Sequence, residues 1–182
     1  MGLPNQSRRF FLRGKFTPQV AYAIRPPWAL AEVLFLDRCS RCDDCISFCP
    51  ENILIRGDGG YPEVQFKHGE CTFCGKCAES CKADALHSPG ASYSPDDAWN
   101  LSVDFSSNCL SLNAIVCRAC GDVCDSQAIH FQLKLGGVAE PKVSQEDCTG
   151  CGACVKPCPV QAISIVQFQP VSQENPTESA SL

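Results

Sequence analysis

The sequence predicts an α+β fold in which two small units follow one another, each built from short β-hairpins and short helices. Three observations support this. The chain of 182 residues has 16 cysteines, and all of them fall into four groups of four. Each half carries two groups, with a glycine-rich turn between apolar segments. Units of roughly 50–65 residues are marginal with a hydrophobic core alone, so we expect bound metal to stabilise them.

The four cysteine groups share one spacing. Each ends in Cys-x2-Cys-x3-Cys, and three have the full form Cys-x2-Cys-x2-Cys-x3-Cys. This is the run by which bacterial ferredoxins hold [4Fe–4S] clusters. The sequence therefore predicts four [4Fe–4S] clusters, two in each unit.

The same spacing predicts which cysteines share a cluster. Steps of two residues let a tight loop place three thiolates around one cubane. The fourth cysteine lies one helical turn further on, and in two-cluster ferredoxins it ligates the other cluster. The predicted ligand sets are set A (Cys39, Cys42, Cys45, Cys81), set B (Cys71, Cys74, Cys77, Cys49), set C (Cys109, Cys117, Cys120, Cys158) and set D (Cys148, Cys151, Cys154, Cys124).

Zinc, disulfides and buried structural cysteines are the competing interpretations. Structural zinc prefers two separated Cys-x-x-Cys pairs or a mixture with histidine, which triplets at i, i+3 and i+6 do not suit. Disulfide frameworks are typical of short secreted chains, and cysteines that serve only packing would not repeat in this way. The pattern favours iron–sulfur clusters.

The cysteine runs also set the expected domain boundaries. Apolar runs around glycine-rich turns predict one hairpin in each unit. We expect short helices after third cysteines and packing of Trp28 and Trp99 against the units. The expected domains are a basic N-terminal tail (1–36), a first ferredoxin unit (37–88), a linker (89–104), a second ferredoxin unit (105–168) and a disordered tail (169–182). The expected elements are strands at 53–55 and 63–66, strands at 128–133 and 138–140, and helices at 46–48 and 155–157.

Charge is distributed unevenly along the chain. Residues 1–25 contain five basic residues and no acidic one, whereas the whole chain has a net charge of −5, so residues 26–182 carry −10. An acidic body repels nucleic-acid phosphates, so we expect no nucleic-acid partner. No segment approaches the roughly 20 apolar residues of a membrane span.

Residues 7–13, Ser-Arg-Arg-Phe-Phe-Leu-Arg, are similar to a twin-arginine export motif. A working signal needs an apolar segment of about 7–15 residues after it, and Lys15, Pro18 and Gln19 interrupt the following stretch. We therefore expect a retained tail and a cytoplasmic protein, in which a reducing environment protects the thiolates. The alternative is an amphipathic helix that docks on the body.

Motifs for catalysis are missing from this sequence. There is no nucleophile–base pair, phosphate loop or dinucleotide fingerprint, and the glycines at 57–60 open no helix. His68, His87 and His130 are scattered along the chain. We expect an electron-transfer or accessory protein and not an enzyme.

Three segments outside the cysteine runs indicate which family of ferredoxin-like proteins the chain resembles. Ser-Arg-Arg at 7–9, Ile-Arg-Pro-Pro-Trp at 24–28 and Arg-Gly-Asp-Gly-Gly-Tyr-Pro at 56–62 occur in this order among the runs. Together they resemble the NapF family, the ferredoxin-type proteins of the periplasmic nitrate reductase system, over residues 5–168. The chain departs from the ferredoxin pattern at Lys82 and Asp125, which replace proline, and in the seven residues between Cys109 and Cys117. The assignment of Cys109 therefore depends mainly on the resemblance.

The resemblance implies a function as well as a fold. Members of that family are cytoplasmic proteins with four [4Fe–4S] clusters. The partner that it implies is the precursor of the catalytic nitrate reductase subunit, whose maturation the protein assists before export. One alternative is an electron-transfer polyferredoxin subunit that relays electrons in a redox enzyme complex. Another is a tail that competes for a chaperone of twin-arginine signals.

Overall fold

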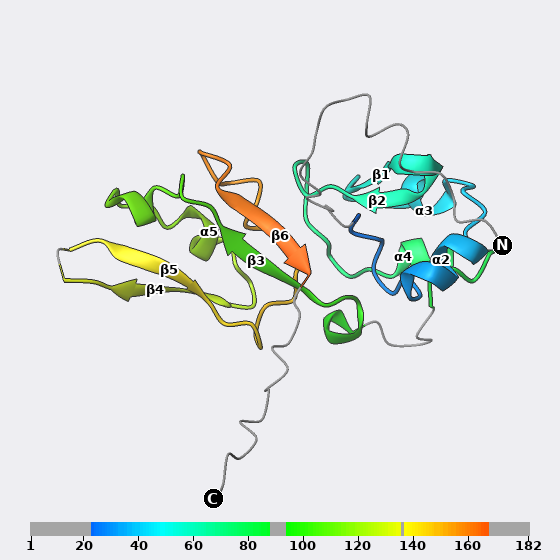
Figure 1. The fold of residues 1–182 in the computed structure, drawn as a ribbon. Coiled ribbons are helices and arrows are strands. Elements are labelled where there is room, and N and C mark those ends of the chain that lie inside the picture. The colour runs from blue at the N-terminus through cyan, green and yellow to red at the C-terminus, as the bar shows by residue number, and fades with distance from the viewer. Residues whose placement is uncertain (1–22, 88–93, 136, 168–182) are drawn as a thin grey trace, which may run out of the picture.

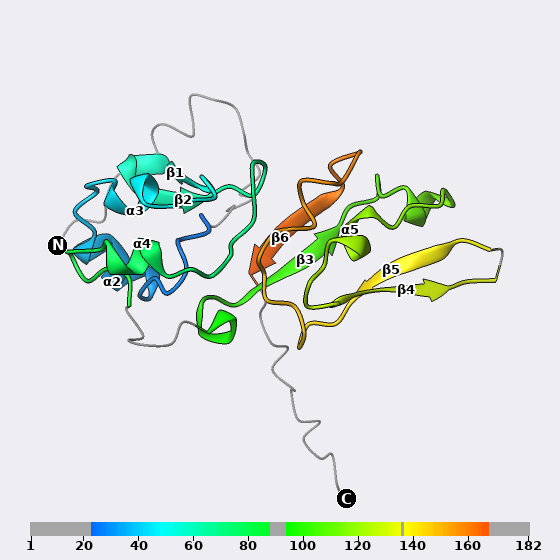
Figure 2. The same cartoon turned by 180° about the vertical axis from the view of Figure 1, so that it is seen from behind.

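The computed structural model describes residues 23–87, 94–135 and 137–167. The twin-arginine-like motif, part of the expected linker and the C-terminal tail at 169–182 lie outside the described residues. The two units lie side by side along an elongated molecule (Figures 1 and 2). Both are built from short helices and two-stranded antiparallel ladders, so the predicted α+β class is confirmed.

The first unit is organised around one hairpin. Strands β1 and β2 pair antiparallel with Ile55 opposite Glu63, and an isolated bridge joins Ala29 to Leu86. The predicted hairpin is therefore present, with both strands displaced by about one residue. The elements of this unit are α2 (Glu32–Arg38), α3 (Asp44–Ser47), β1 (Leu54–Arg56), the 3-10 helix η1 (Asp58–Gly60), β2 (Pro62–Val64) and α4 (Lys76–Glu79).

The second unit contains two antiparallel pairs. The predicted hairpin is present as β4 and β5, but β5 continues through Pro141 to Val143. A second pair joins β3 to β6, with Val103 opposite Ile165. The elements are the 3-10 helix η2 (Pro95–Asp97), β3 (Leu101–Phe105), the 3-10 helix η3 (Ser111–Asn113), α5 (Ala119–Asp122), β4 (Ile129–Leu133), β5 (Ala139–Val143) and β6 (Ile163–Gln167).

The expected linker is partly structured. Within 89–104, the described residues contain η2 and most of β3, so this stretch does not simply connect the units. Leu101, Ser102 and Val103 are all buried. Residues 101–105 do alternate apolar and polar side chains, as a strand would. The strand was missed because the Ser, Pro and Asp residues around it are typical of a linker.

The prediction of a helix at 155–157 is also wrong. Residues 153–157 form successive turns, in which the Val155 N–H donates to the Gly152 carbonyl and the Cys158 N–H to the Val155 carbonyl. Pro157 has no N–H to donate and disfavours a helical conformation at Lys156. The helices of the other three runs begin before the third cysteine and include it.

The first unit begins earlier than the predicted boundary at residue 37. Phe35 is fully buried and Trp28 is 4% exposed, so the described part of the expected tail belongs to the core of this unit. The Arg25 guanidinium pairs with Glu32 at 2.8 Å and lies 5.1 Å from the centre of the Phe35 ring. Helix α2 was missed because Val33, Leu34 and Leu36 are exposed, which hides its apolar stripe.

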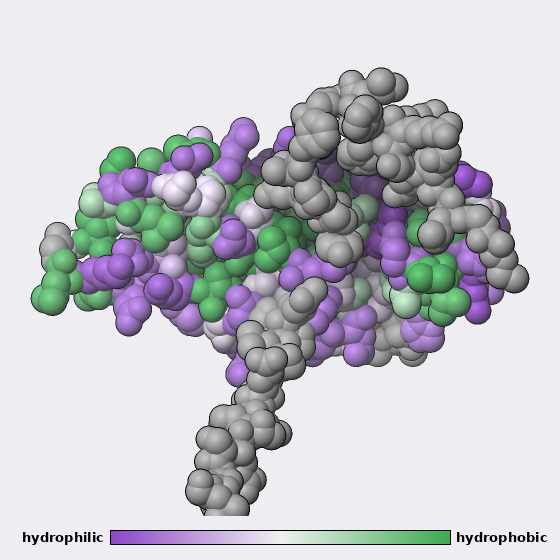
Figure 3. Space-filling model, in the orientation of Figure 1, coloured by the Kyte–Doolittle hydropathy of each residue, from purple (hydrophilic) through white to green (hydrophobic). Residues whose placement is uncertain are grey.

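Cysteines form part of both hydrophobic cores. Cys77 is buried in the core of the first unit, and Cys120 and Cys154 are buried in that of the second. Val155 and Ile165 pack against both cores, so the apolar interior continues from one unit to the other. On the surface of the second unit, apolar side chains lie among polar ones (Figure 3). Ile115 and Val116 are two of the exposed apolar residues of this unit.

Replacement of Phe35 by alanine tests whether α2 stabilises the first unit. Loss of a fully buried phenylalanine should cost about 3–5 kcal/mol. We expect the clusters of the Phe35→Ala variant to bleach at a lower urea concentration, measured by visible absorbance without oxygen. Val33→Ala on the exposed side of the same helix should stay within about 0.5 kcal/mol of the parent chain. Equal midpoints for the two variants would show that α2 is not part of the stabilising core.

Candidate iron–sulfur sites

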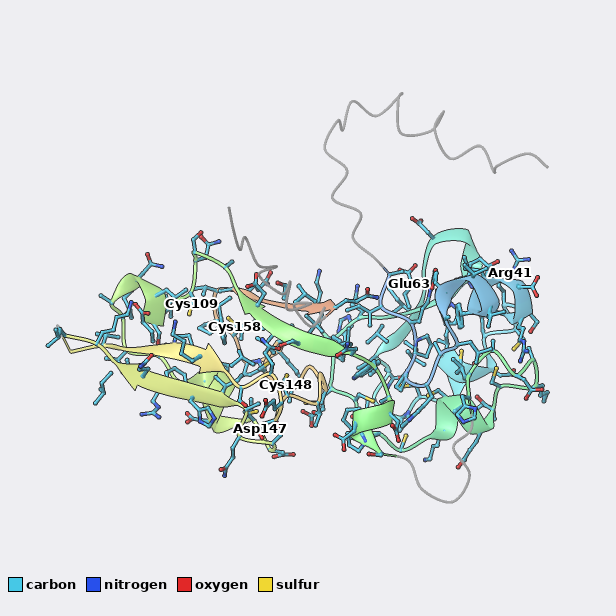
Figure 4. The ribbon with its side chains drawn as sticks, turned by 60° about the horizontal axis from the view of Figure 1, so that its bottom comes forward. Arg41, Glu63, Cys109, Asp147, Cys148 and Cys158 are labelled. Carbon is cyan, nitrogen blue, oxygen red and sulfur yellow. The ribbon has the colours of Figure 1, made fainter. Side chains whose placement is uncertain are left out.

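Four cavities in the described residues are each lined by four cysteines. Every cavity takes three cysteines from one run and the fourth from the other run of the same unit. In Figure 4, Cys109 and Cys158, which come from the two runs of the second unit, lie close together. The cysteines that line the cavities are Cys39, Cys42, Cys45 and Cys81; Cys49, Cys71, Cys74 and Cys77; Cys109, Cys117, Cys120 and Cys158; and Cys124, Cys148, Cys151 and Cys154.

The structure thus brings together the members of each of the sets A, B, C and D. None of these four cavities is lined by His68, His87 or His130. All sixteen cysteines are free thiols, without disulfides among them. We propose that each cavity holds one [4Fe–4S] cluster, with the four cysteines that line it as ligands.

Left-handed backbone turns shape three of the runs. The residues on both sides of the second cysteine have positive φ, which turns the chain back and lets three successive cysteines face one cavity. Only glycine adopts this conformation without steric cost. The residues are Arg41 (φ 58°) and Asp43 (65°), Phe73 (53°) and Gly75 (75°), and Gly150 (69°) and Gly152 (81°). An ion pair between Asp43 and Arg56 of β1 fixes the first of these loops to the hairpin.

The run that starts at Cys109 is built differently. The seven residues between Cys109 and Cys117, where the other runs have two, contain η3, and both cysteines line the same cavity. The Asn113 side-chain amide donates to the carbonyls of Ser107 at 2.7 Å and Cys109 at 2.9 Å. The Ser111 hydroxyl donates to the Cys117 carbonyl at 2.6 Å. The sequence pattern gave no signal for these two polar residues, because their role depends on how the inserted loop closes.

Burial and mutual repulsion oppose thiolate formation in these cavities when no metal is bound. Burial is the largest cause that raises the pKa of Cys45, Cys71, Cys77 and Cys154 to about 12 and that of Cys120 to about 11. For Cys45 the next causes are the charges of Cys39, Cys81 and Cys42, which line the same cavity. These thiols therefore keep their protons at neutral pH until a metal replaces them, and cluster loading must release protons.

The donor arrangement fits a cluster better than a single ion. Among the residues at 23–87, 94–135 and 137–167, no three Cys, His, Asp or Glu side chains converge as one metal ion requires. Each cavity is lined by four cysteines, one for each iron of a cubane. Backbone N–H groups also point at two of the sulfurs, Phe73 at Cys71 (3.4 Å) and Ala162 at Cys158 (3.2 Å). Such hydrogen bonds stabilise negative charge on a ligand sulfur.

Family models describe both units. A model of the 4Fe-4S dicluster domain matches residues 32–82, and a second such model matches residues 115–162. Two dicluster domains imply four [4Fe–4S] clusters. The first match contains all eight cysteines of its unit, whereas the second begins after Cys109. In the part of the chain that the structure describes, no helix is both long and apolar enough to cross a membrane.

Curated relatives match most of the chain. The chain is 47% identical to the ferredoxin-type protein NapF of Haemophilus influenzae, in an alignment 176 residues long that covers 91% of the chain and 96% of the relative. It is 44% identical to NapF of Escherichia coli K12, over 87% of the chain and 93% of the relative. A methylamine utilization ferredoxin-type protein, MauM of Methylorubrum extorquens, is 31% identical over 76% of the chain and 69% of the relative.

The exchange of fourth cysteines between runs can be tested with two matched variants. If Cys49 closes the cavity of set B, Cys49→Ala should cost that site its cluster and expose Cys71, Cys74 and Cys77 to alkylation. Cys39, Cys42 and Cys45 should stay protected, because their cavity keeps all four ligands. Cys81→Ala should give the reverse pattern. The measurement is a short anaerobic pulse of iodoacetamide followed by peptide mass spectrometry.

The opposite result has an equally clear pattern. If each run ligated its own cluster, Cys49→Ala would expose Cys39, Cys42 and Cys45 and leave the second run protected. That outcome would contradict the proposed ligand sets.

Proposed function

Since the chain belongs to the NapF family of ferredoxin-type proteins, we propose that it is an iron–sulfur accessory protein that assists maturation of the catalytic subunit of periplasmic nitrate reductase. In this proposal it acts in the cytoplasm on the precursor, before export. The observation that carries the proposal is the 47% and 44% identity to NapF proteins over more than 90% of their length. The four cysteine cavities support it, because they retain a full set of thiol ligands at every site.

The exposure of the cysteines suits a protein whose clusters exchange electrons with a bound partner. A bound [4Fe–4S] cluster accepts or gives up one electron at a time. Buried Cys77, Cys120 and Cys154 keep water from one side of three cavities, whereas Cys42 and Cys74 are exposed. Their cavities, those of sets A and B, are therefore the ones whose ligands a docked protein could approach most closely. The hydrogen bonds from Phe73 and Ala162 adjust the potentials of sites B and C.

A cytoplasmic location rests on two features. The first is the lack of a sufficiently long apolar segment after the twin-arginine-like motif, which favours retention of the tail. The second is the chemistry of 16 free thiols, which a reducing compartment protects until clusters are loaded. The net charge of −10 over residues 26–182 gives a body that suits a basic surface on the precursor.

The alternative is a polyferredoxin subunit that relays electrons in a redox enzyme complex. A specific observation favours it, because cysteine-bearing loops of the two units touch, with the Cys71 N–H bonded to the Cys151 carbonyl at 2.8 Å. The resemblance to MauM, a ferredoxin-type protein of methylamine utilization, is a further argument for electron transfer outside nitrate reduction. The two functions differ in when the protein is needed.

Timing separates the two functions experimentally. In cells that produce periplasmic nitrate reductase, removal of this chain should lower the iron content of the catalytic subunit, and its return should restore it. The tagged chain should retrieve an export-blocked precursor but not the mature subunit. His130→Ala, on an exposed side chain of β4, is the matched control and should behave as the parent chain.

A different result would replace the accessory function by the alternative. The catalytic subunit would then mature with its full iron content in the absence of this chain. Nitrate reduction by the assembled enzyme would stop when the chain was removed and resume when it was added back.

A further inference from the structure

The two units meet through the loops that carry their cysteines. The Cys71 N–H donates to the Cys151 carbonyl at 2.8 Å, so a residue that lines cavity B is bonded directly to one that lines cavity D. Close by, the Trp99 indole N–H donates to the Thr149 carbonyl at 3.0 Å. The contact therefore joins the second run of the first unit to the second run of the second unit.

Gly152, in the loop that carries Cys151 and Cys154, makes this close approach possible. A Cβ atom at Gly152 would lie 2.1 Å from Cδ1 of Phe66 of the first unit. Within the second unit, a Cβ atom at Gly150 would lie 2.6 Å from Cβ of Leu101. Both glycines have positive φ, so a side chain is excluded at each for steric and conformational reasons. The Phe66 ring of the first unit thus lies directly on the backbone between Cys151 and Cys154.

Aromatic rings fill the junction between the units. Trp99 makes edge-to-face contacts with Phe66 at 5.9 Å and with Phe73 at 6.0 Å between ring centres. Phe66 is 6% exposed, and Val155 packs against the cores of both units. Close-packed side chains of this kind hold one arrangement, so the distance between cavities B and D is fixed by packing and not by a flexible linker.

The shared cysteine runs give the spatial order of the four cavities. In each unit, a run that lines one cavity with three cysteines lines the neighbouring cavity with its fourth, so A lies beside B and C lies beside D. The hydrogen bond from Cys71 to Cys151 joins B to D. The cavities therefore follow one another in the order A, B, D, C.

The same order is visible along the molecule. Cys109 and Cys158 of set C lie toward one end, Cys148 of set D lies nearer the middle, and Arg41, which lines cavity A, lies at the opposite end (Figure 4). The two inner cavities are those that meet at the junction between the units, and each outer cavity has a neighbour on one side only.

We propose that the four sites form a single electron relay in the order A–B–D–C, joined between the units at the contact of Cys71 with Cys151. An electron from a low-potential one-electron donor, such as dithionite, moves between neighbouring sites. It leaves to a one-electron acceptor at either end, and no bond breaks and no proton moves. The rate of electron transfer falls steeply with distance. Because the packed junction holds sites B and D close together, electrons pass from one ferredoxin unit to the other. This inference goes beyond the proposed function and does not depend on the identity of the partner.

Removal of an end site tests whether B and D are neighbours. The double substitution Cys39→Ala with Cys42→Ala removes two ligands of site A and should leave sites B, D and C, with about twelve irons in three cubanes. Iron analysis and protection of the remaining cysteines from iodoacetamide establish that only the intended site is lost. The protein is then fully reduced with dithionite, and its EPR spectrum is recorded.

The relay predicts that all three remaining clusters show magnetic interaction, because B is next to D and D is next to C. A narrow, non-interacting signal that accounts for about one of the three spins would overturn the proposal, since site B would then be isolated. The matched variant, Cys109→Ala with Cys117→Ala, removes site C and leaves A, B and D. For this variant the relay predicts magnetic interaction among the spins of all three remaining clusters. An isolated spin from site D would overturn the proposal. Either variant decides the question if the other fails to fold.

Discussion

Each cavity is closed by a cysteine from the other run of its unit, and this exchange is the constraint on which the rest of the structure depends. Cys81 closes the cavity that begins at Cys39, and Cys49 closes the one that begins at Cys71. Bound clusters would therefore tie each unit together twice, from its beginning to its end. Secondary structure can remain slight under this constraint, with helices of four residues in three runs and a hairpin of three-residue strands in the first unit.

The same constraint destabilises the folded chain when no metal is bound. Positive φ angles at non-glycine residues such as Arg41, Asp43 and Phe73 carry a steric cost, and burial raises the pKa of several thiols to about 12. Iron bound to the thiolates compensates both effects, because it replaces the protons and fixes the loops around the cluster. Folding and cluster assembly are thus expected to be one coupled process.

Local spacing predicted the sites, whereas contacts distant in sequence were not predictable. The members of sets A to D follow from the spacing within the runs, except Cys109, whose assignment depended mainly on the resemblance. Helix α2 was missed because exposed Leu34 obscures its periodicity. Strand β3 was missed because the Ser, Pro and Asp residues around it are typical of a linker. The junction of Phe66 with Gly152 depends on how two units pack.

The iron and acid-labile sulfide content of the anaerobically purified protein tests the central claim most directly. Four cubanes predict about sixteen irons and about sixteen sulfides for each chain. A value near twelve irons would mean that one cavity holds no cubane. We would then expect site C to be the one that lacks its cluster, because the spacing of Cys109 departs from the pattern of the other runs. Zinc without acid-labile sulfide would contradict the account, because the sixteen cysteines would then hold single ions and the cavities would not be cluster sites.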